Sequence, residues 1–391
     1  MRLPAGYFPG RTLAALIVLG VCNHAVMSGV RVAVTLDALA QGASVATVGV
    51  LMALFALLPM LLALSAGRLA DRIGVRRPML WGSIGCTAGA IAPAVWPGLP
   101  GLFLAAALTG VSFMLFQIPA QRATGELGAA SERTANFSWL ALGYGASGFL
   151  GPLIAGFAID AVDFRWAFVV LALPPLLPAI ALAAQRLNLP VVRPLASEGS
   201  RGSAFQLLKH PGLRRILIIN VVFALGWDLH TVFVPIYGSS IGLSAGQVGM
   251  ILAAFAAATF VVRLFLPLIM RRYDETRLMT VALLCAALVF LAFPFLTSAT
   301  ALGVVSFVLG LALGSSQPMV LSQLHAQSPP GRAGAVMGIR MTLMQSMAVA
   351  VPLVFGAVTG AIGLLPVFWS VGLCIGGGGI YAVRNGAPAR S

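Results

Sequence analysis

The chain has 391 residues, of which 59% are hydrophobic and only 9% are charged. Soluble domains carry about 25% charged residues, so the composition excludes a protein whose whole surface faces water. The net charge of +14 does not indicate a nucleic-acid partner, because the basic residues occupy short gaps between apolar blocks and form no aromatic-interleaved patch. We therefore expect an integral membrane protein that contacts the lipid bilayer and no nucleic acid.

Apolar blocks of about 20 residues, the length that crosses a bilayer as a helix, follow one another along the chain. Inside a bilayer the backbone polar groups must bond within their own segment, so such blocks form helices. The sequence thus predicts an all-α membrane protein with twelve transmembrane helices. In chain order, the predicted spans are 12–36, 45–66, 78–96, 101–121, 134–159, 164–184, 215–237, 246–270, 278–296, 301–323, 335–361 and 365–383.

The longest polar stretch divides the spans into two sets of six. We predict a first half (1–184), a cytoplasmic linker (185–213) and a second half (214–391). An offset of 200 residues relates the halves, and parallel repeats of this kind form two pseudo-symmetric six-helix bundles with a substrate site between them. The residues that recur are Gly42, Ser44, Val48, Gly49, Ala53, Phe55, Ala56, Gly110 and Gln117, as Gly242, Ser244, Val248, Gly249, Ala253, Phe255, Ala256, Gly310 and Gln317.

Basic residues concentrate in the loops on one side of the predicted membrane. If both termini are cytoplasmic, 20 of the 24 basic residues lie in cytoplasmic segments. The other four are Arg165 in an outer loop, and Arg31, Arg263 and Arg340 within spans. Cytoplasmic loops of membrane proteins carry such an excess, which supports an even number of spans. Short loops and the preference for arginine over lysine are typical of a bacterial cytoplasmic (inner) membrane protein.

The loop between the second and third spans carries the most specific motif. It reads Gly67-Arg68-Leu69-Ala70-Asp71-Arg72-Ile73-Gly74-Val75-Arg76-Arg77. This segment resembles the signature loop of the major facilitator superfamily, with Val75 where a basic residue is usual. The resemblance implies a cytoplasmic gate motif that locks the outward-facing state. It assigns that role to Gly67, Asp71, Arg72, Gly74, Arg76 and Arg77, and Asp71 is expected to cap a neighbouring helix.

The fifth span resembles the pattern that proton-coupled exporters of this superfamily carry there. The matching residues are Gly148, Gly151, Pro152 and Gly156. Small residues permit close helix approach and proline bends a helix, so ordinary membrane packing is the alternative. Ala106 stands where drug exporters of the family usually have an arginine, so their standard proton relay is incomplete in this chain.

Asp228 is the one acidic residue placed deep within a predicted span, the seventh. Charged groups are costly in a bilayer and are functional candidates by default. We predict that Asp228 carries a coupling proton with His230 as a relay; a structural ion pair to an arginine is the alternative.

Further polar residues fall on spans 1, 4, 7, 10 and 11. The arginines could extend to the interface, pair with an acid or bind an anionic substrate, and the glutamines could bind substrate or join helices. The residues expected to line a substrate cavity are Asn23, His24, Arg31, Gln117, Gln121, Trp227, Gln317, Gln323 and Arg340.

The sequence contains no phosphate-binding loop, metal-ligand cluster or nucleophile–base pair. We therefore expect neither an enzyme nor a cofactor, and no ATP-driven pump. The favoured hypothesis is a monomeric, proton-coupled antiporter of the drug/metabolite exporter-like branch, which exports a small organic compound by alternating access. The alternatives are an importer of a small organic anion and a non-transporting membrane sensor or accessory protein.

Overall fold

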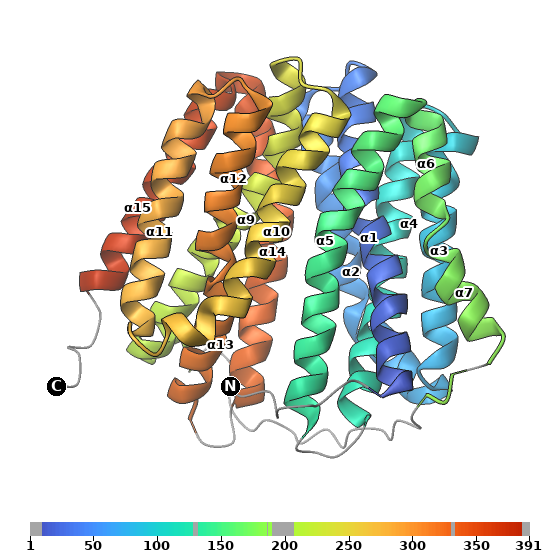
Figure 1. The fold of residues 1–391 in the computed structure, drawn as a ribbon, viewed down its shortest axis with the longest axis horizontal. Coiled ribbons are helices and arrows are strands. Elements are labelled where there is room, and N and C mark those ends of the chain that lie inside the picture. Colours follow the sequence, from blue (N-terminus) through green and yellow to red (C-terminus); the bar gives the residue numbers. More distant parts are fainter. Residues whose placement is uncertain (1–9, 128–131, 186, 190–206, 330–332, 385–391) are drawn as a thin grey trace.

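The computed structural model describes residues 10–127, 132–185, 187–189, 207–329 and 333–384. Twelve helical spans within these ranges are long and apolar enough to cross a membrane. They stand side by side in two groups that surround a central region (Figure 1). The predicted all-α membrane fold with twelve spans is confirmed.

The first six spans form one bundle. They are α1 (Arg11–Ala40), α2 (Val45–Ile73), α3 (Arg76–Val95), α4 (Leu99–Glu126), α5 (Arg133–Ala161), and a sixth span made of α6 (Phe164–Ala172) and α7 (Leu176–Ala183). The sixth span is interrupted at Pro174 and Pro175, whose missing N–H groups break the helical ladder.

The second six spans form the other bundle. They are α9 (Pro211–Ser240), α10 (Ala245–Ile269), α11 (Glu275–Ala292) with the short η2 (Phe293–Phe295), α12 (Ala299–Gly314) with α13 (Ser316–Gln327), α14 (Ala333–Ile362) and α15 (Leu364–Arg384). Several helices run beyond the predicted apolar blocks. The block of the second span ends at 66, for example, whereas α2 continues to Ile73, because a helix can carry arginines once it leaves the hydrocarbon layer.

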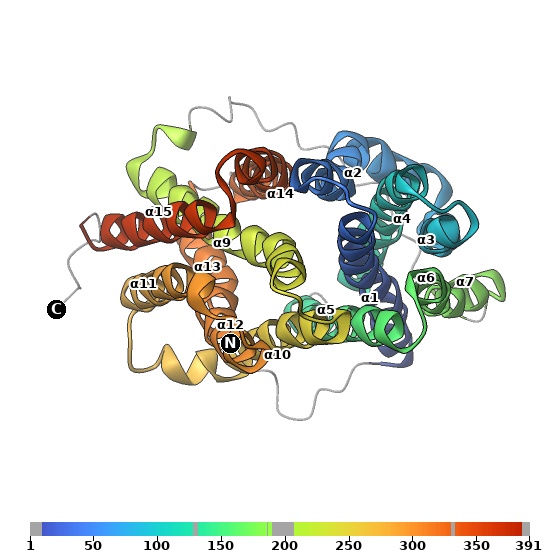
Figure 2. The same cartoon turned by 90° about the horizontal axis from the view of Figure 1, so that it is seen from above.

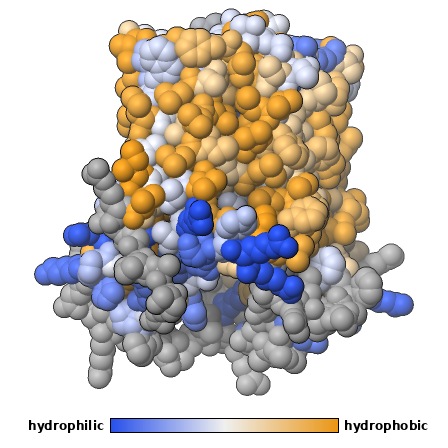
Figure 3. All heavy atoms as spheres, turned by 60° about the vertical axis from the view of Figure 1, so that its left-hand side comes forward, coloured by the Kyte–Doolittle hydropathy of each residue, from blue (hydrophilic) through white to orange (hydrophobic). Residues whose placement is uncertain are grey.

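The outer surface of the bundles is apolar over its middle. Large exposed side chains such as Leu61, Ile180, Leu288 and Leu373 belong to helices that pack only on their inner face. Figure 3 shows hydrophobic residues covering the body, with hydrophilic residues gathered at the end where the basic loops lie. An apolar surface of this extent is suited to lipid contact, so the chain is a multi-pass membrane protein.

The repeat is visible in the turns that begin the second span of each half. Gly42 and Gly242 have φ angles of 77° and 79°, which residues with a Cβ atom rarely adopt. In each half the next helix begins directly after a serine. Ser44 Oγ accepts a hydrogen bond from the Thr47 N–H, and Ser244 Oγ accepts one from the Gln247 N–H. The glycine and serine therefore recur because the same helix–turn–helix recurs.

The two bundles meet at two crossings, α2 with α14 and α5 with α10, which Figure 2 shows on opposite sides of the central region. At the first crossing the backbone of Gly49 lies against the carbonyl oxygen of Pro352 and the Cα of Gly356. A Cβ atom at Gly49 would collide with that carbonyl oxygen. The first crossing therefore depends on a glycine.

The second crossing repeats this geometry 200 residues away. A Cβ atom on Gly249 would lie 2.5 Å from the carbonyl oxygen of Pro152 and 3.5 Å from the Cα of Gly156. Both crossings lie near the starts of α2 and α10, at the end opposite the basic loops. The halves are thus in closest backbone contact at that end.

One carboxylate makes the two crossings unequal. Asp160 of α5 accepts hydrogen bonds from Ser244 Oγ at 2.6 Å, from the Ala245 N–H at 3.0 Å and from the Gly246 N–H at 2.8 Å. A negative charge at a helix N-terminus is stabilising. The residue at the related position of the other crossing is Gly360, so only α5 and α10 are joined in this way.

Gly249→Ala should destabilise the protein, because the methyl group would force the α5 and α10 backbones apart. Overpacking of this kind costs about 1–3 kcal/mol. Gly303→Ala on α12 is the matched control: its Cβ would meet no atom within 4 Å, and alanine favours a helix by about 1 kcal/mol over glycine. Thermal unfolding in detergent should show a lower Tm for the first variant only, and an unchanged Tm for Gly249→Ala would contradict the crossing.

Candidate functional site

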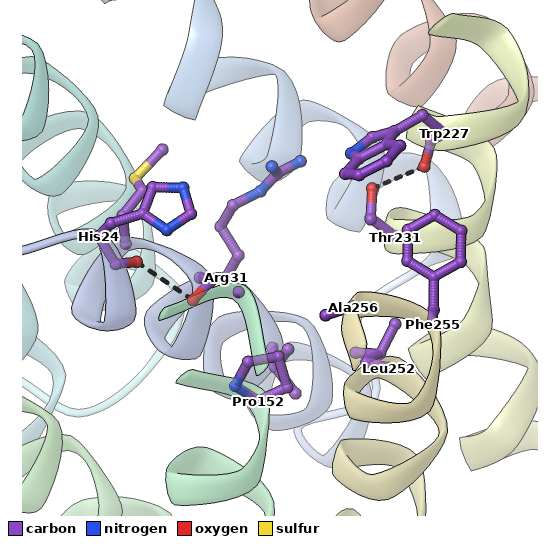
Figure 4. A pocket seen from close by; sticks show the side chains of 12 residues that line it. His24, Arg31, Pro152, Trp227, Thr231, Leu252, Phe255 and Ala256 are labelled. Atoms are coloured by element: carbon purple, nitrogen blue, oxygen red, sulfur yellow. Dashed lines mark hydrogen bonds between the residues drawn. The ribbon is translucent and has the colours of Figure 1, made fainter. Parts of the chain in front are cut away.

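A cavity of about 180 Å³ lies between the two halves. Its walls come from α1 and α5 of the first half and from α9 and α10 of the second (Figure 4). Its lining combines polar and apolar side chains. The lining residues are His24, Met27, Ser28, Arg31, Val32, Gly148, Pro152, Trp227, Thr231, Leu252, Phe255 and Ala256.

Opposite charges lie on two contacting helices of the two halves, α1 and α9. Arg31 extends from α1 into the cavity in Figure 4, with its guanidinium 6.0 Å from the centroid of the Phe55 ring. Asp228 of α9 lines neither cavity itself but follows the cavity residue Trp227. Thr231 Oγ1 donates to the backbone oxygens of Trp227 and Asp228 at 3.1 and 3.2 Å, within the same stretch of α9.

His24 occupies the wall that belongs to the first half. Its Nδ1 and Ser147 Oγ share a hydrogen bond of 2.7 Å. The rings of Phe113 and Tyr144 lie 5.3 and 5.2 Å from the imidazole, centroid to centroid. These contacts from α4 and α5 hold the ring in place at the edge of the cavity.

Asn23 and His230, by contrast, lie away from the cavity. Asn23 Nδ2 donates to Ser83 Oγ at 3.2 Å and joins α1 to α3. His230 is fully buried, shares a 3.0 Å hydrogen bond with Ser306 Oγ and stacks on Phe255 with centroids 4.2 Å apart. Successive helical residues point about 100° apart, so a neighbour of a cavity residue faces another helix.

A second cavity, of about 230 Å³, lies within the second half. Trp227 borders both cavities and stands between them. The lining residues come from α9, α10, α12, α13 and α14, and include two arginines. They are Asn220, Phe223, Ala224, Trp227, Arg263, Leu313, Ser316, Gln317, Arg340 and Met344.

Besides Asn23, three predicted cavity residues line neither of these spaces: Gln117, Gln121 and Gln323. Gln117 and Gln317 are related by the repeat, yet only Gln317 borders a cavity. The repeat positions them on equivalent helices, but the surrounding side chains differ between the halves.

The residues of the predicted gate motif lie at the end of α2 and the start of α3. Gly74, with a φ of 79°, ends α2, and Arg76 donates hydrogen bonds to the backbone oxygens of Leu182 and Leu187 in its own half. Arg72 and Arg77 are exposed, and Gly67 sits within α2 without a close neighbour. The side chain of Asp71 lies outside the described part of the structure, so its expected capping role stays a prediction.

The glycines of the fifth span face three different neighbours. Gly148 borders the first cavity, and Gly151 lies against the backbone of α1 at Ala25 and Gly29. Gly156 lies against Ala245 at the crossing with α10. The spacing of small residues along α5 thus permits two close helix contacts and one cavity wall.

Sequence reasoning overlooked Asp160 and Ser147. Asp160 stands in the last turn of α5, where a negative charge is unfavourable for its own helix. An acid at that end needs an external donor, and this signal could have indicated a partner. Ser147 gave no such signal, because a small polar residue in a membrane helix is common.

One family model matches most of the chain. Residues 16–352 match the family model described as "Major Facilitator Superfamily". The tetracycline resistance protein, class B, of Escherichia coli is 33% identical over 110 residues, which are 28% of this chain and 27% of that protein. The match therefore spans about a quarter of the length of that relative.

Solved structures share the fold at low sequence identity. A mutant of the peptide transporter POT in complex with sulfate has a TM-score of 0.80 at 16% identity, covering 97% of this chain and 95% of its own. A POT family transporter in complex with 5-aminolevulinic acid has a TM-score of 0.79 at 15% identity, covering 98% of both chains. With the family model matching most of the sequence, the chain belongs to the major facilitator superfamily and shares its fold.

Proposed function

We propose that the protein is a proton-coupled secondary transporter that exports a small organic compound by alternating access. The observation that carries this proposal is the position of two opposite charges on contacting helices of the two halves: Arg31 of α1 lines the central cavity, and Asp228 of α9 follows the cavity residue Trp227. A proton on one of the two groups changes the attraction between the halves. The site can therefore link protonation to the relative position of the bundles.

The coupling follows from elementary electrostatics. Removal from water favours the neutral form of a carboxyl group in general, whereas a nearby cation favours its charged form. For export against an inward proton gradient, the proton and the substrate must occupy the transporter in turn. Asp228 would take up a proton on the outer side as the substrate leaves, and would release it on the cytoplasmic side as the next substrate binds.

The arrangement of the halves supports alternating access. The glycine crossings and Asp160 hold the halves together at one end. The predicted gate motif lies at the opposite end. We propose that the basic end is cytoplasmic, in a bacterial inner membrane, and that both termini lie there. The transporter acts as a monomer, because both cavities and both crossings are formed within one chain.

Export is the proposed direction of transport. The name of the tetracycline resistance protein and the fifth-span motif favour export. Import of a small organic anion is the second candidate, because Arg31 offers a positive charge inside the central cavity. Fluxes in vesicles of defined orientation separate the two.

Asp228→Asn should abolish pH-gradient-driven transport, because the carboxamide cannot take up the coupling proton. A compound transported by the native protein is first selected from a panel of small organic acids and bases. In proteoliposomes, the gradient-driven rate should fall at least tenfold, while exchange of labelled for unlabelled compound without a gradient continues. Asp163→Asn is the matched control, since Asp163 caps α6 at an exposed turn and asparagine is also a good cap. Full gradient-driven transport by Asp228→Asn would refute the proton role.

A cysteine at Ser28 should react with a charged, impermeant thiol reagent, because Ser28 lines the central cavity. The reference is Ser83→Cys, which places the thiol at a fully buried position between α1 and α3. Both variants are made in a chain whose four native cysteines are replaced by alanine. Ser28→Cys should react at least tenfold faster, and the transported compound should slow it. Equal rates would show that the cavity is closed to water.

A further inference from the structure

Two arginines of the second half enter one cavity from different helices. Arg340 of α14 is only 6% exposed, and its Nε donates to Asn220 Oδ1 at 3.2 Å. Arg263 of α10 donates from Nη2 to Gln317 Oε1 at 2.9 Å. Both side chains line the second cavity, which is about 230 Å³. The sequence left open whether these arginines extend to the membrane interface, but the burial of Arg340 beside Asn220 shows an inward orientation.

No carboxylate of the described residues accepts a hydrogen bond from either guanidinium. The partners of Arg340 are Asn220 Oδ1 and Met341 Sδ, and those of Arg263 are Gln317 Oε1 and, at 3.5 Å, the Gly314 oxygen. No acidic residue lines the cavity either. Neutral acceptors satisfy individual N–H groups but leave the positive charge uncompensated, and a buried charge such as that of Arg340 is costly unless paired.

The acid nearest along α9 lies away from these arginines. Asp228 lies eight residues beyond Asn220, a rise of about 12 Å along a helix. Asp228 does not line the second cavity and accepts no hydrogen bond from Arg263 or Arg340. Among the described residues, the two arginines of the second cavity therefore have no counter-ion in its lining.

The other walls indicate the kind of anion that fits. Phe223, Leu313 and Met344 are apolar, and Trp227 presents an aromatic ring. An inorganic anion would leave these surfaces in contact with water. An organic anion would place its charged head against the guanidinium groups, which bind carboxylates with two parallel hydrogen bonds, and its apolar body against these side chains.

We infer that the second cavity is an anion subsite, in which Arg263 and Arg340 hold the carboxylate of a small organic acid whose apolar part packs on Trp227 and Phe223. This inference rests on the proposed transport function, since it assigns a chemical class to the transported compound. It places the head group in the second half, separate from the Arg31–Asp228 pair.

The test is calorimetric titration of the purified full-length protein with 3-phenylpropionate and with its neutral amide, 3-phenylpropanamide. The two probes differ in charge and share the same apolar body. The native protein should bind the carboxylate at least tenfold more tightly than the amide. Arg263→Gln and Arg340→Met should each remove that preference, while Arg277→Gln, at an exposed arginine of α11, should keep it. Because Arg340 is buried and its replacement could impair folding, Arg263→Gln is the decisive variant, and thermal unfolding verifies each protein.

The outcomes separate this inference from the proposed function. Equal affinity for the two probes, or a preference that survives Arg263→Gln in folded protein, overturns the anion subsite even if gradient-driven transport is intact. Preferential carboxylate binding that depends on Arg263 supports the subsite even if no flux is found, in which case it is the transport proposal that fails.

Discussion

The close backbone contact between the halves is the constraint on which the rest of the structure depends. Two helix pairs cross where a glycine of one lies against a prolyl carbonyl of the other, Gly49 on Pro352 and Gly249 on Pro152. In a bilayer, helices gain little from hiding apolar surface, so association depends on contact at short range. These crossings set the distance between the bundles, and this distance determines the width of the cavity that both bundles line.

The helices that form the crossings also form the site. α5 contributes Gly148 to the cavity, Gly151 to the contact with α1, and Pro152 and Gly156 to the contact with α10. A movement of α5 relative to α10 therefore changes the cavity wall directly. Arg31 belongs to α1, which packs against α5, and Asp228 belongs to α9, which packs against α10. A change in the relative position of the two halves therefore also changes the relative position of these two charged residues.

The number of spans and the relation between the two halves could be predicted from the sequence, because both depend only on the order of residues along the chain. Span number follows from the length of apolar blocks, and the relation of Gly49 to Gly249 follows from register alone. Which side of a helix a residue faces depends on its neighbours in space. Asn23 was predicted to line a substrate cavity and His230 to relay a proton, whereas their hydrogen bonds join them to Ser83 and Ser306 on other helices. The inward orientation of Arg340 depends on Asn220, 120 residues away.

Asp160 has a consequence for how the molecule is made. Ribosomes synthesise proteins from the N-terminus, so α5 exists before α10. The first turn of α10 then finds a carboxylate already positioned to accept its N–H groups at 2.8 and 3.0 Å. The carboxylate that caps α10 is thus present in the chain before the helix that it caps.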